Sequence, residues 1–174
     1  MNGWRQARAI ALLPGAVAVL LPAIILIVGD GPNVGWGING LAATLPVLLG
    51  AVLIIAGFAL WLWTVRLFAR IGKGTLAPWD PTQHLVVIGP YAHVRNPMIS
   101  AVLAVLLGEA ALFGSPGVLI LAAAFLVANY AFFLLHEEPG LERRFGEEYR
   151  AYKRAVPRWI PRRRPWVARL DRRR

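Results

Sequence analysis

Two short polar clusters flank a long apolar stretch, and they contain residue types suited to binding a charged ligand. Arg95-Asn96-Pro97 stands immediately before the stretch, and His136-Glu137-Glu138 stands immediately after it. Residues 98–135 between them contain one charged side chain, Glu109. An arginine offers forked donors to a carboxylate or phosphate, and adjacent carboxylates attract a cation. Together the clusters indicate a polar binding site, provided that the fold brings them together.

The apolar stretch predicts a helical hairpin that does so. As helix it would run about 57 Å, close to twice the roughly 30 Å of a bilayer core. A turn at Gly114-Ser115-Pro116 divides it into the segments Met98–Phe113 and Pro116–Leu135. Because an up-and-down hairpin returns the chain to the face that it left, we expect Arg95 and the two glutamates to meet at one membrane surface.

The first cluster is typical of a helix start. Asn96 is a favoured N-cap residue and Pro97 a favoured first helical residue. A helix start offers free backbone N–H groups and the positive end of the helix dipole, and Arg95 adds a cation. The cluster therefore predicts a place for a carboxylate or phosphate. The alternative is an ordinary capped helix whose arginine reaches the lipid headgroups.

The second cluster lies where the helix dipole disfavours negative charge. Glu137 and Glu138 stand at the C-terminal end of the second hairpin helix, so their charges cost stability unless a cation offsets them. A positively charged or hydroxyl-rich ligand near Arg95 would account for both clusters. The alternative is a salt bridge to Arg143 or Arg144.

The composition predicts an all-α integral membrane protein. The chain has 174 residues, of which 57% are hydrophobic, and its mean hydropathy is +0.56. Ala9–Val28 and Leu41–Val65 contain no charge and add two spans to the hairpin, giving about four transmembrane helices. We expect a single domain comprising residues 1–80 with the first two helices, the motif region 81–161, and a basic tail, 162–174.

Basic residues predict the orientation. The 19 Lys and Arg residues lie before the first helix, between the second and third, or after the fourth, and the connections 29–40 and 114–115 contain none. The positive-inside rule then places both termini and residues 66–97 in the cytoplasm at the cell membrane. The net charge of +10 is explained by this topology without nucleic acid, and the basic tail predicts contact with anionic lipid.

Residues Glu137–Val156 have the pattern of an amphipathic helix. Apolar side chains recur at helical steps at Leu141, Phe145, Tyr149, Tyr152 and Val156. Such a helix is expected to lie in the headgroup plane with its apolar side toward the lipid.

Other chemistry has weaker support. The chain has no cysteine, which excludes disulfides and cysteine nucleophiles. Residues 35–40 match G-x-G-x-x-G but lack the preceding strand that a dinucleotide site needs. His84, His93 and His136 have no metal-ligand spacing, so we expect no metal. Glu109 lies near a helix end, where its carboxylate can reach outward.

Two stretches resemble a known family. Residues 85–97, LVVIGPYAHVRNP, and the run from Glu137-Glu138 through residues 145–149, FGEEY, to Val156-Pro157-Arg158 are similar to the membrane methyltransferases related to isoprenylcysteine carboxyl methyltransferase and the phospholipid N-methyltransferases. The resemblance covers roughly residues 80–161. It implies a helical membrane enzyme that uses S-adenosylmethionine, with a tunnel from the bilayer for a lipophilic acceptor.

The resemblance also implies roles for individual residues. Glu137 corresponds to the glutamate that holds the cofactor, and Asn96 replaces a histidine of the isoprenylcysteine branch. Arg95 is expected to orient an anionic group, and Glu138 to support the site or handle a proton. The residues expected at the cofactor are Gln83, His84, Leu85, Val86, Tyr91, Asn96, Pro97, Met98 and Glu137.

Departures from the family pattern keep the acceptor open. Phe133 falls where the isoprenylcysteine enzymes have an arginine for the substrate, and Ile99 falls where tyrosine is frequent. The acceptor can therefore be a lipid carboxylate, an amine headgroup or a smaller lipophilic molecule. The alternatives are a non-catalytic scaffold that binds anionic lipid and a small transporter that uses Glu109.

Overall fold

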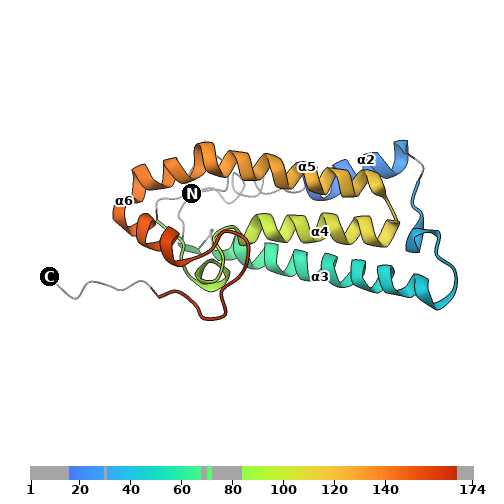
Figure 1. Cartoon of the computed structure of the whole chain (residues 1–174), viewed down its shortest axis with the longest axis horizontal. Helices are drawn as coiled ribbons and strands as arrows, with labels where there is room; N and C mark the ends of the chain where they lie inside the picture. The colour runs from blue at the N-terminus through green and yellow to red at the C-terminus, as the bar shows by residue number, and fades with distance from the viewer. Residues whose placement is uncertain (1–15, 30, 68–69, 72–83, 168–174) are drawn as a thin grey trace.

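The computed structural model consists of helices that run side by side (Figure 1). It describes residues 16–29, 31–67, 70–71 and 84–167, and these contain helices and no strand. The main helices are α2 (Leu21–Val28), α3 (Thr44–Leu67), α4 (Pro97–Phe113), α5 (Pro116–Phe132) and α6 (Glu138–Ala155). π-Helical turns at Ala16–Leu20 and Phe133–Glu137 precede α2 and α6, and 3-10 turns lie at Val34–Gly37, Gly40–Ala43 and Gly89–Ala92. The expected all-helical fold class is confirmed.

The helices have the length and surface of a membrane protein. Two of them, Gly40–Leu67 and Pro116–Ala155, are long and apolar enough to cross a membrane, and Ala16–Val28 and Pro97–Phe113 are shorter apolar helices. The start of the first predicted helix, before residue 16, lies outside the described residues. Exposed apolar side chains follow α3, among them Leu45, Leu48, Val52 and Ile55. Such a surface is stable in lipid and not in water, so the chain is a membrane protein.

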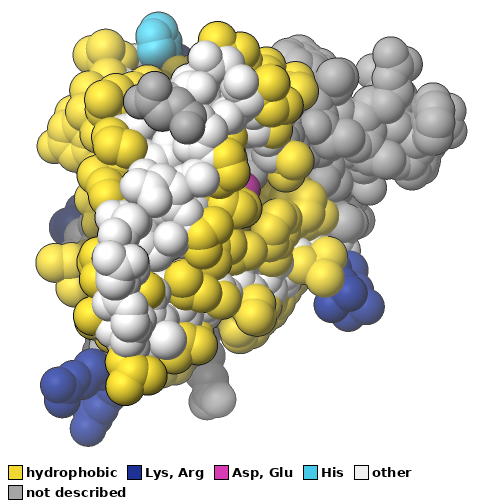
Figure 2. Space-filling model, turned by 90° about the vertical axis from the view of Figure 1, so that its right-hand side faces the viewer, with side chains coloured by type: hydrophobic (Ala, Val, Ile, Leu, Met, Phe, Trp, Pro, Cys, Tyr) yellow, Lys and Arg dark blue, Asp and Glu magenta, His cyan; other side chains and the backbone are white. Residues whose placement is uncertain are grey.

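Charge is distributed unevenly between the two ends of the bundle. The end that carries residues 31–43 shows mainly apolar and uncharged groups, with Lys and Arg side chains only at the margins of the view (Figure 2). Arg66 ends α3, Arg95 precedes α4, and the basic residues of α6 follow α5. The described cations therefore gather at one end.

Small residues let α3 and α4 pack backbone to backbone. A Cβ atom built on Gly50 would lie 2.6 Å from the carbonyl oxygen of Gly108, and one on Gly108 would lie 2.7 Å from the carbonyl oxygen of Gly50. Two turns further along α3, a Cβ atom built on Gly57 would lie 2.8 Å from the carbonyl oxygen of Ala101. Close approach through small residues is a common way to join helices in lipid. It fixes α4, and hence Arg95, against α3.

The predicted hairpin is confirmed. Helix α4 ends at Phe113, Gly114 adopts a left-handed conformation (φ 56°), and the Ser115 hydroxyl accepts a hydrogen bond from the backbone N–H of Val118 (3.3 Å). Buried Val102, Val105 and Leu106 of α4 pack with Ala122 of α5. The chain therefore returns to the end at which α4 began.

The C-terminal part differs from the expected interfacial helix. Helix α6 continues from α5 through the π-helical turn and then breaks at Gly146 (φ 53°, ψ −126°). Beyond the break, Tyr149, Tyr152 and Val156 are buried, and Leu85 and Val87 pack against them. These apolar side chains thus contact the protein itself instead of the lipid.

The segment after α6 is bound to the chain that precedes α4. Backbone N–H groups of Arg162 and Trp166 donate to the carbonyl oxygens of His93 (3.0 Å) and Ala92 (2.8 Å), and the Arg95 N–H donates to Pro157 (2.9 Å). We call residues 157–166 the C-terminal strap. It holds Arg158 close to Arg95.

Candidate active site

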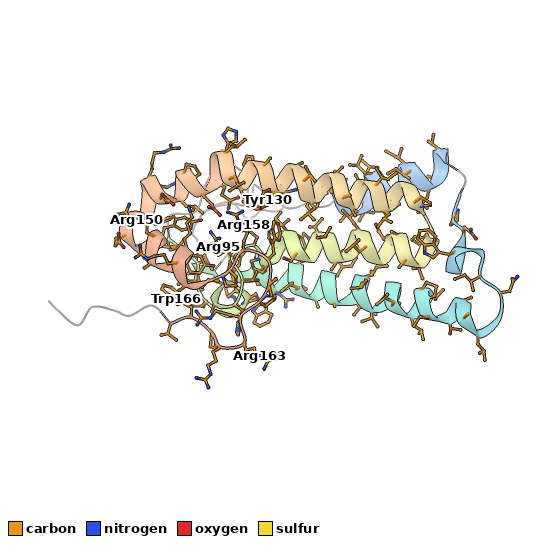
Figure 3. The ribbon with its side chains drawn as sticks, in the orientation of Figure 1. Arg95, Tyr130, Arg150, Arg158, Arg163 and Trp166 are labelled. Atoms are coloured by element: carbon orange, nitrogen blue, oxygen red, sulfur yellow. The ribbon has the colours of Figure 1, made fainter. Side chains whose placement is uncertain are left out.

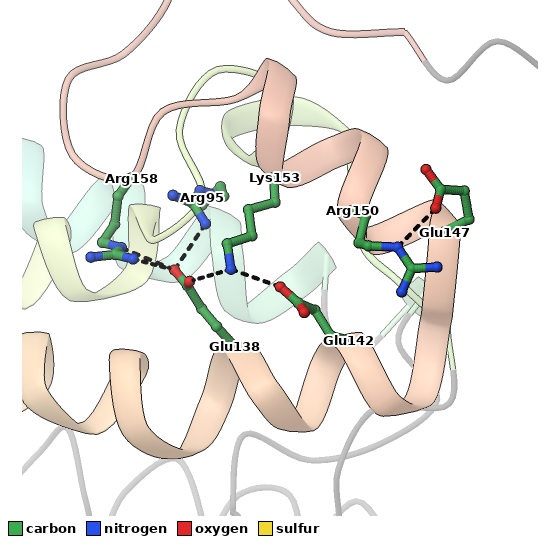
Figure 4. Close-up of polar contacts among 7 residues, drawn as sticks. All are labelled: Arg95, Glu138, Glu142, Glu147, Arg150, Lys153 and Arg158. Atoms are coloured by element: carbon green, nitrogen blue, oxygen red, sulfur yellow. Dashed lines mark hydrogen bonds and ion pairs between the residues drawn. The ribbon is translucent and has the colours of Figure 1, made fainter.

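A buried carboxylate, Glu138, lies at the centre of the basic end of the bundle. Its Oε1 atom accepts hydrogen bonds from Arg95 Nη1 (2.8 Å) and from Arg158 Nε and Nη2 (3.0 and 2.5 Å). Its Oε2 atom forms an ion pair with Lys153 Nζ at 3.1 Å (Figure 4). The Glu138 side chain is only 8% exposed. One carboxylate thus joins the start of α4, the second half of α6 and the C-terminal strap.

This cluster confirms that the hairpin brings Arg95 and a glutamate together. The partners of Glu138 are not Arg143 or Arg144, which the sequence offered as an alternative. Lys153 also binds Glu142 at 2.7 Å. The ion pairs of Arg95 and Arg158 therefore join α6 to the start of α4 and to the C-terminal strap, and those of Lys153 join the two halves of α6.

Glu138 is held in its ionised form. Burial raises its pKa, but hydrogen bonds from Lys153 and Arg158 and the charge of Arg95 outweigh burial, so the pKa lies below the ordinary value. A carboxylate with three cationic partners is a poor proton acceptor near neutral pH. The geometry favours a supporting role for Glu138 over proton transfer.

Glu137 has a different environment. Its side chain is partly buried, and no side chain of the described residues forms a hydrogen bond or ion pair with its carboxylate. Burial, together with the charge of Glu138, raises its pKa to about 7 against the opposing charge of Arg144. A cation placed beside Glu137 would stabilise its ionised form. Glu137 can therefore bind a positively charged ligand.

Tyr91 lies within electrostatic reach of Glu137. Burial is the main cause of the raised pKa of the Tyr91 hydroxyl, and the charges of Tyr152 and Glu137 add to it. The Tyr152 hydroxyl donates to the carbonyl oxygen of Tyr91 (2.8 Å), which fixes this turn. The structure thus brings Tyr91 and Glu137 to one region, as expected from the sequence.

The four residues before Tyr91 that we expected at the cofactor lie in different surroundings. Leu85 packs against Tyr149 and Tyr152, and Val86 is buried, so both contribute to a hydrophobic core. His84 is exposed, and Gln83 lies outside the described residues.

Asn96 occupies the predicted N-cap position of α4, but its side chain makes no capping hydrogen bond. Its carbonyl oxygen accepts from the backbone N–H and hydroxyl of Ser100 (3.1 and 3.0 Å). Pro97 is the buried first residue of α4, and Met98 follows it, partly buried. The Asn96 amide is therefore not committed to the helix start.

Sequence reasoning missed Lys153 and Arg158. Both lie beyond the hairpin, and the break at Gly146 is needed to turn Lys153 back toward Glu138. The Arg158 guanidinium also lies over the ring of Tyr130, with its central carbon 5.1 Å from the ring centroid (Figure 3). Arg158 follows Val156-Pro157 in a motif that the resemblance included, and this was the available signal.

Glu109 does not take part in this cluster. It lies 14 residues after Arg95, about 20 Å along the helix axis. Its side chain is partly buried, and its Oε2 atom has no hydrogen-bond partner in the described structure. The expected outward reach of its carboxylate stays a prediction. The described residues contain no group of three His, Asp or Glu side chains that could hold a metal ion.

Comparison with known proteins identifies the family. Residues 45–148, more than half of the chain, match the family described as phospholipid methyltransferase. No curated protein and no solved structure matches the chain. The match extends from the start of α3 through the α4–α5 hairpin to the first half of α6, and it includes Arg95, Glu137 and Glu138. The chain therefore belongs to the phospholipid methyltransferase family and is a membrane methyltransferase.

Proposed function

We propose that the protein transfers a methyl group from S-adenosylmethionine to a lipophilic acceptor at the cytoplasmic membrane face. The proposal rests on two features that lie at one end of the hairpin. One is a carboxylate to which the described residues supply no cationic hydrogen-bond partner, and the other is a cluster with surplus donors. Glu137 supplies the carboxylate. Arg95 supplies a buried Nε–H group with no acceptor in the described structure.

These groups fit the cofactor. Its amino acid portion carries an ammonium and a carboxylate, which Glu137 and Arg95 complement. When bound, S-adenosylmethionine supplies a methyl group whose bond to the sulfonium sulfur breaks as the acceptor nucleophile bonds to the methyl carbon. The further residues that we assign to the cofactor by resemblance are Gln83, His84, Leu85, Val86, Tyr91, Asn96, Pro97 and Met98.

The protein contributes positioning and exclusion of water. Glu138 keeps Arg95 in place through the 2.8 Å ion pair, and the C-terminal strap covers the segment that contains Tyr91. In-line transfer from a sulfonium needs the two reacting atoms aligned and little water between them. We propose the single membrane domain to be the unit that provides this alignment.

The acceptor is proposed to be a phospholipid headgroup or another lipid. Family membership favours the phospholipid, and Phe133 in place of an arginine argues against a prenylcysteine carboxylate. The positive-inside rule supports a cytoplasmic site and cytoplasmic termini. The exposed Arg163 and Arg164 of the C-terminal strap favour contact with anionic lipid.

A transfer assay tests the proposal. Purified protein is incubated with methyl-labelled S-adenosylmethionine and total membrane lipid, and label in the lipid fraction is counted. We expect incorporation by the wild type and by Glu148→Ala, an exposed matched control, and loss with Glu137→Ala or Arg95→Ala. Activity in both site variants would show that the assigned roles are wrong. A protein that neither methylates lipid nor binds the cofactor would be a scaffold.

A further inference from the structure

The ion-pair cluster contains more positive than negative charge. Arg95, Lys153 and Arg158 are three cations, and Glu138 and Glu142 are the two carboxylates that they contact. The arginines lie deep, with side chains 12% and 14% exposed. An excess charge that is withdrawn from water costs free energy unless an anion accompanies it. One further negative charge would therefore balance the charges of the cluster.

The two arginines also retain unused donors. Arg158 directs both Nε and Nη2 to a single oxygen, Glu138 Oε1, and its Nη1 has no partner among the described residues. The Nε–H of Arg95 is buried without an acceptor. Because both guanidinium groups contact the same oxygen, they are held beside each other. The Nε–H of Arg95 is left for the cofactor, and the free Nη1 of Arg158 is held in a fixed place where a guanidinium binds a phosphate oxygen well.

The position of Arg158 links this cluster to the bilayer. Its guanidinium covers the ring of Tyr130, which is 46% exposed on the last turn of the apolar helix α5. The next residue of the strap, Trp159, packs edge-on against Phe133 of the π-helical turn, with ring centroids 6.3 Å apart. Figure 3 places Arg158 and Tyr130 together at this end of α5. A ligand with apolar chains along α5 would present its headgroup at Arg158.

We propose that Arg158 binds the phosphate group of a phospholipid acceptor through the donors that Glu138 leaves free, and that Arg158 determines acceptor specificity, while the Arg95 Nε–H serves the carboxylate of the cofactor. The inference rests on the proposed function, and it assigns the substrate to lipids that carry a phosphate. A guanidinium on the C-terminal strap thereby takes the place of the substrate arginine that is absent at Phe133. Glu138 binds both arginines and so fixes the position of one guanidinium relative to the other.

Titration calorimetry in nonionic detergent tests the proposal with three probes. These are dihexanoyl phosphatidic acid, dihexanoylglycerol with the same chains and no phosphate, and inorganic phosphate. We expect saturable binding of the phosphatidic acid to the wild type, and affinities at least about tenfold lower for the other two probes, since each lacks one recognised part. Equal affinity for dihexanoylglycerol, or for inorganic phosphate, would overturn a lipid-phosphate site.

Three variants assign the binding to Arg158. We expect Arg158→Gln to weaken binding of the phosphatidic acid by at least about tenfold, because a charge-assisted bidentate contact is lost. Arg158→Lys retains the ion pair with Glu138 and is expected to fold, with a smaller loss of about threefold to tenfold. Arg163→Gln removes an exposed positive charge from the same strap and should stay within twofold of the wild type. Equal losses in Arg158→Lys and Arg163→Gln would contradict the assignment.

Titration of S-adenosylhomocysteine separates this inference from the proposed function. We expect both Arg158 variants to bind it within about twofold of the wild type, since the arginine serves the acceptor. Binding of S-adenosylhomocysteine without binding of phosphatidic acid would overturn the acceptor site alone. Absence of S-adenosylhomocysteine binding in the wild type would overturn the proposed function instead.

Discussion

Replacing Glu138 by glutamine should destabilise the protein more than any other single loss of charge in the cluster. The substitution keeps the size of the side chain and removes the one negative charge that Arg95, Lys153 and Arg158 share. Since the side chains of Glu138 and Arg95 are 8% and 12% exposed, water cannot replace the lost partner. Removing one member of a buried ion pair costs about 3 to 5 kcal/mol.

Thermal unfolding in detergent measures this loss. For a chain of this size, about 3 kcal/mol corresponds to a midpoint about 6 to 12 °C lower. Glu142→Gln is the control. Among the described residues Glu142 forms an ion pair with Lys153 alone, and its side chain is 35% exposed, so the substitution should cost about 1 kcal/mol or less. Midpoints that fall equally in the two variants would refute the assignment of Glu138 as the central charge.

The same residue predicts a pH dependence of stability. The folded-state pKa of Glu138 lies below the ordinary glutamate value of 4.5, so its ionised form adds stability at neutral pH. That contribution is lost as the pH falls through 4.5 toward the lowered pKa. Acid should therefore narrow the difference in midpoint between the wild type and Glu138→Gln. A difference that stays constant down to acidic pH would contradict the argument.

Three further predictions concern the cofactor carboxylate and two glycine positions. The pKa of Glu137 is raised to about 7, so the ionised fraction of its carboxylate is about eightfold larger at pH 7.5 than at pH 6.0. Calorimetry should therefore show S-adenosylhomocysteine binding about eightfold more tightly at pH 7.5. The substitution Glu137→Gln should remove this pH dependence. Gly108→Ala should lower the unfolding midpoint, because its Cβ would lie 2.7 Å from the carbonyl oxygen of Gly50 and overpacking costs about 1 to 3 kcal/mol. Gly146→Ala should lower the free energy of unfolding by about 1 to 3 kcal/mol because of the positive φ alone. Gly140→Ala is the control, since the space around its Cβ is equally open, and it should be neutral or stabilising. Equal unfolding midpoints for these two variants would refute a strained break at Gly146.

The hairpin and the meeting of its flanking clusters could be predicted from the sequence. Apolar length, the Gly114-Ser115-Pro116 turn and the absence of charge are local signals for the hairpin. Asn96 and Pro97 predicted the start of α4 where the structure has it. Once two helices of equal length lie antiparallel, Arg95 and Glu138 must return to the same end. The family resemblance rested on the same segments.

The remaining contacts could not be predicted, because they depend on the chain beyond residue 146. The apolar steps from Leu141 to Val156 continue unbroken in the sequence, so they indicate one helix and conceal the break at Gly146. The break turns Lys153 toward Glu138, and the backbone hydrogen bonds of the strap then place Arg158 beside it. Burial of Tyr149 and Tyr152 against Leu85 also depends on this reversal, since the sequence pattern cannot distinguish a protein surface from a lipid surface.

The most direct test of the central claim is calorimetric titration of S-adenosylhomocysteine into detergent-purified protein, with wild type and Glu137→Ala compared. Glu148→Ala serves as the control for loss of a glutamate at an exposed position. The proposed cofactor site predicts saturable binding by the wild type and the control, and loss of binding in Glu137→Ala. Absence of binding by folded wild type, or undiminished binding by Glu137→Ala, would contradict it.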